Sequence, residues 1–264
     1  MQTNIGNYAK HAQYWDWSGH DRTAENEYWY KYAKKYGNHV LIPMCAWGET
    51  GFYMARRGMD VTAFDITPEM IAEGKKRFGI MPNLRLYEGD VRNFKFNITP
   101  VDFCYSVDFG HLSTIHDVKR ALICINSHLR MGGAMVIETG LRMSDAQSFT
   151  TPVETFYPLR QVYPDIKVWK TGVTHGDADT GRHYITQTFY AQHENGHIEQ
   201  FDHAFYLQCY TREEWLEAFA ECGYKIVGEY RDRELAPWQS DGGGFCIFEA
   251  VKEYEKYLGD EQHG

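Results

Sequence analysis

The sequence predicts an α/β protein with a Rossmann-like, mostly parallel sheet. Residues 39–67 alternate as a strand, a glycine-bearing bend, a short helix and a second strand that ends at Asp65. Apolar runs at 84–87 and 101–107 predict a third and a fourth strand, each followed by a polar segment. Because ligands bind beyond the carboxyl ends of parallel strands, this order predicts a ligand site at one edge of the sheet.

The first two strands and the bend between them have the chemistry of a site for an adenosine-bearing cofactor. The apolar run 40–44 leads into Trp47-Gly48-Glu49-Thr50-Gly51, where a glycine lets the backbone approach a ligand. Asp65 stands at the carboxyl end of the next strand, 61–64. An acid at that position can accept hydrogen bonds from both hydroxyls of a ribose.

The rest of a large sheet is expected further along the chain. An apolar stripe between 113 and 130 predicts a helix that ends at Gly132-Gly133. A capping box, Thr211-Arg212-Glu213-Glu214, starts the last helix. The remaining strands are expected at 134–137, 224–230 and 245–251.

Between residues 141 and 207 the alternation of helix and strand breaks. The runs 184–192 and 197–208 are rich in aromatic and β-branched residues, and Asn195-Gly196 between them is a hairpin signal. An antiparallel β insertion follows from this pattern, and it would serve as a substrate lid or as the contact of a homodimer. The expected division is a core of 1–140 and 208–252 with an N-terminal helical arm, the insertion 141–207, and a C-terminal tail 253–264.

This order of segments resembles the class I S-adenosylmethionine (SAM) methyltransferases, from about Tyr8 to Val251. The resemblance implies a seven-stranded sheet with SAM as the cofactor. By position, Asp65 would hold the ribose hydroxyls with Ile66 against the adenine, and Asp90 would accept from the adenine amino group beside the N–H of Val91. The residues that the resemblance assigns to the cofactor are Met44, Cys45, Ala46, Trp47, Gly48, Asp65, Ile66, Asp90, Val91 and Asp108.

The first loop departs from the family pattern Asp-x-Gly-x-Gly-x-Gly. Ile42 replaces the acid, Met44 and Ala46 replace the first two glycines, and Gly48 alone remains. Because a non-glycine residue at positive φ costs free energy, we expect this loop to differ in shape. Pro43-Met44-Cys45 is similar to the Pro-Leu-Cys of the thiopurine methyltransferases, which also break the glycine pattern.

His111 and Tyr14 are the candidate catalytic residues. An amine that is methylated must be neutral, and a histidine with an ordinary pKa of about 6.5 can take or relay its proton. The segment Tyr14–Asp21 resembles the N-terminal arm of the amino-sugar N,N-dimethyltransferases, and Gly110-His111-Leu112 resembles a segment of the same group and of glycine N-methyltransferase. The amino-sugar N,N-dimethyltransferases pair a tyrosine of the arm with a histidine of this segment, and these two residues match Tyr14 and His111 here. A structural imidazole and a packing aromatic are the alternative interpretations of the two residues.

Composition excludes several classes of function. The net charge is −9 with no basic run, which disfavours binding to nucleic acid. No apolar run reaches the length of a membrane span, and the polar N-terminus lacks a signal-peptide pattern. Six cysteines without a Cys-x-x-Cys pair fit a reducing cytoplasm. No metal site is predicted, since no zinc signature fits the spacing of His175, His183, His193, His197 and His203.

The sequence therefore predicts a cytoplasmic SAM-dependent methyltransferase that acts on a small polar metabolite, at an amine nitrogen. Two alternatives stay open. On the same fold, attack by SAM's own amine or carboxylate on its chain would make the protein a cyclase or lyase that releases methylthioadenosine. A non-catalytic SAM-binding protein is the other. The product formed from SAM distinguishes the three.

Overall fold

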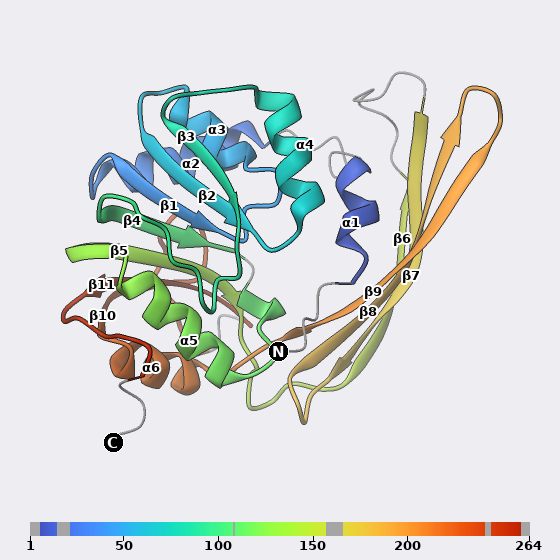
Figure 1. Ribbon diagram of the computed structural model, residues 1–264. Helices are drawn as coiled ribbons and strands as arrows, with labels where there is room; N and C mark the ends of the chain where they lie inside the picture. The colour runs from blue at the N-terminus through green and yellow to red at the C-terminus, as the bar shows by residue number, and fades with distance from the viewer. Residues whose placement is uncertain (1–5, 15–21, 108, 157–165, 241–243, 260–264) are drawn as a thin grey trace.

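The computed structural model describes residues 6–14, 22–107, 109–156, 166–240 and 244–259, which build two separate sheets (Figure 1). The strands of the large sheet are β1 (His39–Pro43), β2 (Asp60–Asp65), β3 (Leu84–Glu88), β4 (Val101–Ser106), β5 (Leu129–Gly140), β10 (Tyr224–Tyr230) and β11 (Phe245–Lys252). Their order in space is β10-β11-β5-β4-β1-β2-β3. The predicted fold class, a Rossmann-like seven-stranded sheet with an antiparallel β insertion, is confirmed.

Five neighbouring strands of the large sheet, β3, β2, β1, β4 and β5, are parallel, whereas β11 and β10 add to β5 in antiparallel fashion. The middle strands are short apolar runs, and Val40 and Leu41 of β1 are fully buried. Burial on both faces is typical of a parallel sheet that helices cover on both sides. The carboxyl ends of the five parallel strands therefore meet at one edge, where most of the predicted site residues that the structure describes lie.

Helices cover both faces of the large sheet. They are α2 (Thr23–Lys34), α3 (Glu49–Ala55), α4 (Pro68–Phe78), α5 (Ile115–Asn126) and α6 (Arg212–Glu221). Trp29 of α2 and Met54 of α3 lie in one apolar cluster with β1 and β2, while Leu122 of α5 and Trp215 of α6 lie in a second cluster with β5 and β11. The predicted capping box of α6 is present, with Thr211 as its N-cap.

The prediction that the helix after β4 extends to Arg130 is wrong, because α5 ends at Asn126 and β5 already begins at Leu129. The two glycines expected to end the helix lie inside β5. Val101 of β4 pairs with Leu129, but Phe103 pairs with Ala134, so residues between these partners bulge out of the ladder. Gly132, with φ of 69°, provides the backbone conformation that this bulge requires.

The small sheet contains the predicted hairpin and two strands that the sequence did not reveal. Its members are β6 (Phe149–Phe156), β7 (Ile166–Asp177), β8 (Arg182–His193) and β9 (Ile198–Gln208), paired in this order and all antiparallel. β8 and β9 are joined across Asn195-Gly196, and Gly196 has φ of 80°. One face of this sheet, which includes Phe189 and His203, is buried.

The arm helix α1 (Tyr8–His11) lies between the small sheet and the large-sheet body (Figure 1). On one side, the indole Nε1 of Trp47 in the first loop donates to the carbonyl of Ala12 at 3.0 Å. On the other side, the ring of His11 lies 4.5 Å from that of Phe189 and 5.1 Å from that of His203. The backbone N–H of Asn7 donates to Nδ1 of His203 at 2.9 Å. The arm therefore connects the first loop to the small sheet.

Two buried imidazoles, one on the arm and one on β9, make the docking of the arm sensitive to acid. Burial, the nearby His203 and Lys170 lower the pKa of His11 to about 3, and burial, His111 and Lys170 lower the pKa of His203 to about 4. Both pKa values lie below the unfolded value of about 6.5. The neutral imidazoles therefore stabilise the folded protein above about pH 6.5, and this contribution is lost as the pH falls towards the folded values.

We expect His11→Phe to remove part of this acid sensitivity. Between pH 7 and pH 5, the wild-type protein should lose about 2 kcal/mol more in its free energy of unfolding than the variant, because the variant lacks one imidazole that must stay neutral. Urea unfolding at both pH values measures the difference. His197→Phe, at an exposed position, is the matched control and should lose as much as the wild type. Equal losses in all three proteins would contradict the prediction.

Candidate active site

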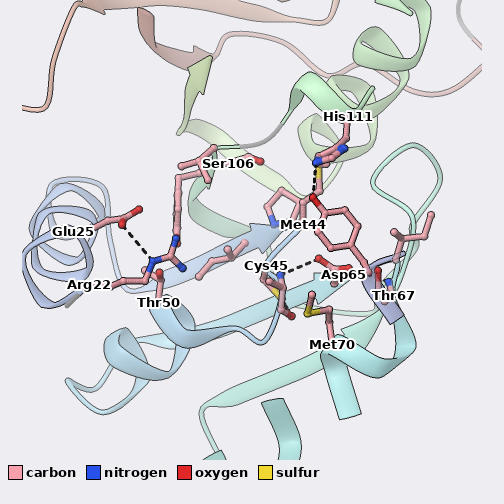
Figure 2. A pocket seen from close by; sticks show the side chains of 17 residues that line it. Arg22, Glu25, Met44, Cys45, Thr50, Asp65, Thr67, Met70, Ser106 and His111 are labelled. Atoms are coloured by element: carbon pink, nitrogen blue, oxygen red, sulfur yellow. Dashed lines mark hydrogen bonds and ion pairs between the residues drawn. The ribbon is translucent and has the colours of Figure 1, made fainter. Parts of the chain in front are cut away.

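A cavity of about 300 Å³ opens at the carboxyl edge of the parallel strands, between the first loop and the arm (Figure 2). Six predicted site residues reach it, from the first loop, the end of β2 and the segment after β4. The described residues that line it are Tyr8, Arg22, Glu25, Ile42, Pro43, Met44, Cys45, Ala46, Thr50, Asp65, Ile66, Thr67, Met70, Tyr105, Ser106, Val107 and His111. A cavity of this size accommodates a small molecule.

The first loop does not avoid positive φ, and our expectation on this point is wrong. Met44 has φ of 56°, Ala46 has φ of 50° and Gly48 has φ of 80°, so every second residue is left-handed where the family pattern has glycine. Such a conformation costs about 1–2 kcal/mol at a residue with a Cβ. The loop keeps it because its N–H groups are bonded, that of Cys45 to the carbonyl of Phe64 at 3.0 Å and that of Gly48 to the carbonyl of Cys45 at 2.8 Å.

Asp65 holds this loop and faces the cavity at the same time. Its Oδ2 accepts from the backbone N–H of Ala46, and its Oδ1 accepts from the N–H of Thr67, both at 2.9 Å. A carboxylate can accept about four hydrogen bonds, so two backbone bonds do not exhaust its capacity. Burial and the charge of Asp65 raise the pKa of the Cys45 thiol well above its ordinary value, so this cysteine is neutral. Asp65 is therefore the anion at this end of the cavity.

The opposite end of the cavity carries a cation and a buried hydroxyl. Figure 2 shows Arg22 and Glu25 across the cavity from Asp65. Nε of Arg22 lies 3.5 Å from a carboxylate oxygen of Glu25. Ser106, at the end of β4, is 2% exposed, and its Oγ has no hydrogen-bond partner among the described residues. A buried hydroxyl normally has a partner, so this atom indicates where a polar ligand group fits.

The residues present fit SAM. Its ribose diol requires an acceptor, and Asp65 supplies one. Its amino-acid end carries a carboxylate and an amine, and Arg22, Glu25 and Ser106 supply opposite charges and a hydroxyl at the far end. A guanidinium is suited to a carboxylate because its N–H groups form a planar fork.

An ion-pair network supports the cation at this end. Nε and Nη2 of Arg233 each donate to Glu138 at 2.7 Å, and Nη2 also lies 3.2 Å from Glu25. Glu138 is buried near the end of β5, and Glu25 lies in the first turn of α2. Arg22, Glu25, Arg233 and Glu138 therefore alternate in charge. This alternation fixes Glu25 and, through it, Arg22 at the wall of the cavity.

His111 has a tyrosine partner, but it is Tyr8 and not Tyr14. The hydroxyl of Tyr8 lies 3.1 Å from Nε2 of His111, and the two residues line the cavity together. Tyr14 donates instead to Glu199 of β9 at 2.8 Å, and its ring stacks on Phe201. The structure therefore does not bring the two predicted catalytic residues together. Sequence reasoning missed Tyr8, since its position depends on the docking of the arm.

Other predicted cofactor residues lie outside this cavity. Trp47 and Gly48 line a small adjoining pocket of about 30 Å³. Asp90 accepts from Arg92 through both carboxylate oxygens, at 2.6–3.1 Å, and neither Asp90 nor Val91 lines the cavity. Asp108 lies outside the described residues.

Arg22, Thr50, Tyr105 and Ser106 line the cavity although sequence reasoning did not select them. Thr50 belongs to the glycine-bearing bend and Tyr105 and Ser106 to the fourth predicted strand, but no sequence pattern assigned their side chains to a ligand. Within the described part of the chain, no group of three or more His, Cys, Asp or Glu residues is placed to hold a metal ion. No helix in that part is long and apolar enough to cross a membrane.

The sheet order and the cavity at its carboxyl edge define a protein with the class I methyltransferase fold. Residues 40–133 match the family model described as a methyltransferase domain. A relative over most of the chain is YqeM of Bacillus subtilis, which is provisionally named a methyltransferase. It is 21% identical over 243 residues, covering 85% of this chain and 86% of that protein.

Solved structures agree on the fold. A SAM-dependent methyltransferase from Clostridium acetobutylicum superposes with a TM-score of 0.75 at 14% identity, over 94% of this chain and 99% of that one. The sugar N-methyltransferase KedS8 from Streptoalloteichus superposes with a TM-score of 0.72 at 15% sequence identity, over 96% of each chain. SAM-bound CalS10, an amino pentose methyltransferase from Micromonospora echinaspora, superposes with a TM-score of 0.67 at 20% sequence identity, over 92% of this chain and 96% of that one. These structures establish the class I methyltransferase fold, and the family model identifies a methyltransferase domain at residues 40–133.

The left-handed loop leads to a prediction on stability. Ala46→Gly should raise the free energy of unfolding by about 0.5–1 kcal/mol, because glycine adopts positive φ without the cost that a Cβ imposes. Ala72→Gly, at an exposed position inside α4, is the matched control and should lower it by about 1 kcal/mol. Urea unfolding measures both changes. A loss of stability in Ala46→Gly as large as in the control would show that the loop is not strained at this residue.

Asp65→Ala should weaken binding of S-adenosylhomocysteine at least tenfold. The variant loses the acceptor for the ribose hydroxyls, worth on the order of 1.5–3 kcal/mol, and leaves the Ala46 N–H without its acceptor. Isothermal titration calorimetry measures the affinity, and circular dichroism checks the fold. Asp60→Ala removes an acid at the other end of β2 and should leave the affinity unchanged. Unchanged affinity in a folded Asp65→Ala variant would remove Asp65 from the cofactor site.

Proposed function

We propose that this protein transfers a methyl group from SAM to an amine nitrogen of a small polar metabolite. The observation that carries the proposal is the Tyr8–His111 pair, 3.1 Å apart in the wall of the cavity that fits SAM. When bound, SAM supplies an electrophilic methyl group on its sulfonium sulfur. The residues of this chain orient the reactants and handle the proton of the acceptor.

Residues at the two ends of the cavity would bind and orient the cofactor. Asp65 would hold the ribose, with Ile66 and Met70 beside the base, and Arg22 would hold the carboxylate of the amino-acid end. These contacts fix the cofactor at points far from its methyl group. Fixing both ends limits the positions that the methyl group can take, which is the contribution that enzymes make to an in-line displacement.

Tyr8 and His111 are placed to move the proton. An amine acceptor attacks only as the neutral base, and its nitrogen sheds a proton during the reaction. We assign this proton to the Tyr8 oxygen, while the hydroxyl proton of Tyr8 passes to Nε2 of His111. This route requires His111 to be neutral with Nε2 unprotonated. The rings of Phe205 and Tyr8 around His111 help to keep water from this wall.

The similar structures support nitrogen as the target. KedS8 is described as a sugar N-methyltransferase and CalS10 as an amino pentose methyltransferase. The proposal extends the use of an amine acceptor from those proteins to this chain. All six cysteines are free thiols, which supports a reducing compartment such as the cytoplasm.

The products formed from SAM test the proposal. Incubation with SAM and a panel of amines, including glucosamine, glycine and cyclohexylamine, should yield S-adenosylhomocysteine in step with a methylated amine. His111→Ala should then lower turnover about a hundredfold and Tyr8→Phe at least about tenfold, because each breaks the proton route. Tyr14→Phe should keep nearly full turnover, since its hydroxyl contacts Glu199. Mass spectrometry of the products measures the turnover of the wild type and of the three variants.

Calorimetry with S-adenosylhomocysteine is the control and should give similar affinities for the three variants. Methylthioadenosine formed without any acceptor would replace the proposal by a SAM cyclase or lyase. Binding of SAM with no product from any amine would favour a non-catalytic SAM-binding protein. Loss of turnover in Tyr14→Phe but not in Tyr8→Phe would restore the pairing that the sequence resemblance implied.

A further inference from the structure

A second cavity, of about 440 Å³, lies beside the cofactor cavity at the same edge of the large sheet. The segment after β4, the end of β5, the segment that follows β5 and the last residues of β9 form most of its wall. Val107 lines both cavities, and Gly110, which lines the second, directly precedes His111 of the first. This volume is in the range of a small-molecule site.

The wall of the second cavity is apolar with an acidic mouth. Leu141 and Leu207 provide apolar surface, and Asp145 provides an exposed carboxylate. Glu138 also lines it, but its charge is balanced by Arg233. Burial lowers the pKa of His183, so this residue stays neutral near pH 7. None of the described lining residues is a lysine or an arginine.

We propose that this cavity binds the methyl acceptor, as a compact amine with an apolar body and without a phosphate or carboxylate group. The inference rests on the proposed function and names its class of substrate. The acidic mouth attracts a cation and repels an anion, and an anion inside would lose its hydration without gaining a positive partner. The apolar body lies against Leu141 and Leu207, and the nitrogen reaches the Val107–His111 side, where Tyr8 and His111 take its proton.

Cyclohexylamine is a probe with the proposed chemistry, and cyclohexanecarboxylate matches it in shape with the opposite charge. In the protein saturated with S-adenosylhomocysteine, titration followed by NMR should show cyclohexylamine binding at least tenfold more tightly than cyclohexanecarboxylate. Asp145→Asn should reduce this preference about threefold or more.

A tryptophan at the mouth locates the probe. Ala146→Trp fills the cavity from an exposed position and should weaken cyclohexylamine binding at least tenfold. Gln147→Trp, at the next exposed residue and outside the lining, is the matched control and should bind like the wild type. The affinity for S-adenosylhomocysteine should be the same in both variants, which also shows that they are folded.

The outcomes separate this inference from the proposed function. Equal binding of the amine and the carboxylate, or unchanged amine binding in Ala146→Trp, would overturn the inference. If the Ala146→Trp variant methylates amines as fast as the wild type, the inference about the second cavity is overturned while the proposed function stands. Cavity binding of cyclohexylamine with no methylated product from any amine would overturn the proposed function and the acceptor role together.

Discussion

The bonds from one carboxylate to two backbone N–H groups support the whole site. Asp65 binds the N–H of Ala46 in the first loop and the N–H of Thr67 ahead of α4, so it joins the ends of β1 and β2. The loop can then keep left-handed residues at Met44 and Ala46, whose conformation costs free energy. A carboxylate that shapes the loop and also faces the cavity links the formation of the site to the folding of the sheet.

The position of the proton-handling pair depends on that loop. Trp47 is buried, and its indole N–H bonds to Ala12 just after the arm helix. With the arm held there, Tyr8 lies at His111, which the segment after β4 presents from another side. A shift of the loop would move Trp47, the arm and Tyr8 together. The proposed cofactor site and the proposed proton route therefore depend on the same contacts.

The sequence predicted what depends on local pattern and parallel topology. Asp65 and His111 were selected because the ends of neighbouring parallel strands meet at one edge, whatever the details of packing. Tyr8 was not selected, because its place depends on a contact between Trp47 and Ala12 across the chain. Met44 and Ala46 adopt positive φ, which residues with a Cβ normally avoid, because the hydrogen bonds of the first loop outweigh the cost of this conformation. Arg22 carried no signal because a single arginine before a helix has no characteristic pattern.

In the proposed reaction, docking of the arm also determines which groups face the acceptor nitrogen. Without α1, His111 would lack its tyrosine, and the face of the small sheet with Phe189 and His203 would lose the side chains that cover it. The imidazoles of His11 on the arm and His203 on β9 are buried uncharged where the arm meets the small sheet, and their lowered pKa values mean that protonation opposes docking. A rise in pH favours the docked arm up to about pH 6.5 and favours the neutral amine at higher pH. Closure of the site and readiness of the acceptor therefore respond to pH in the same direction.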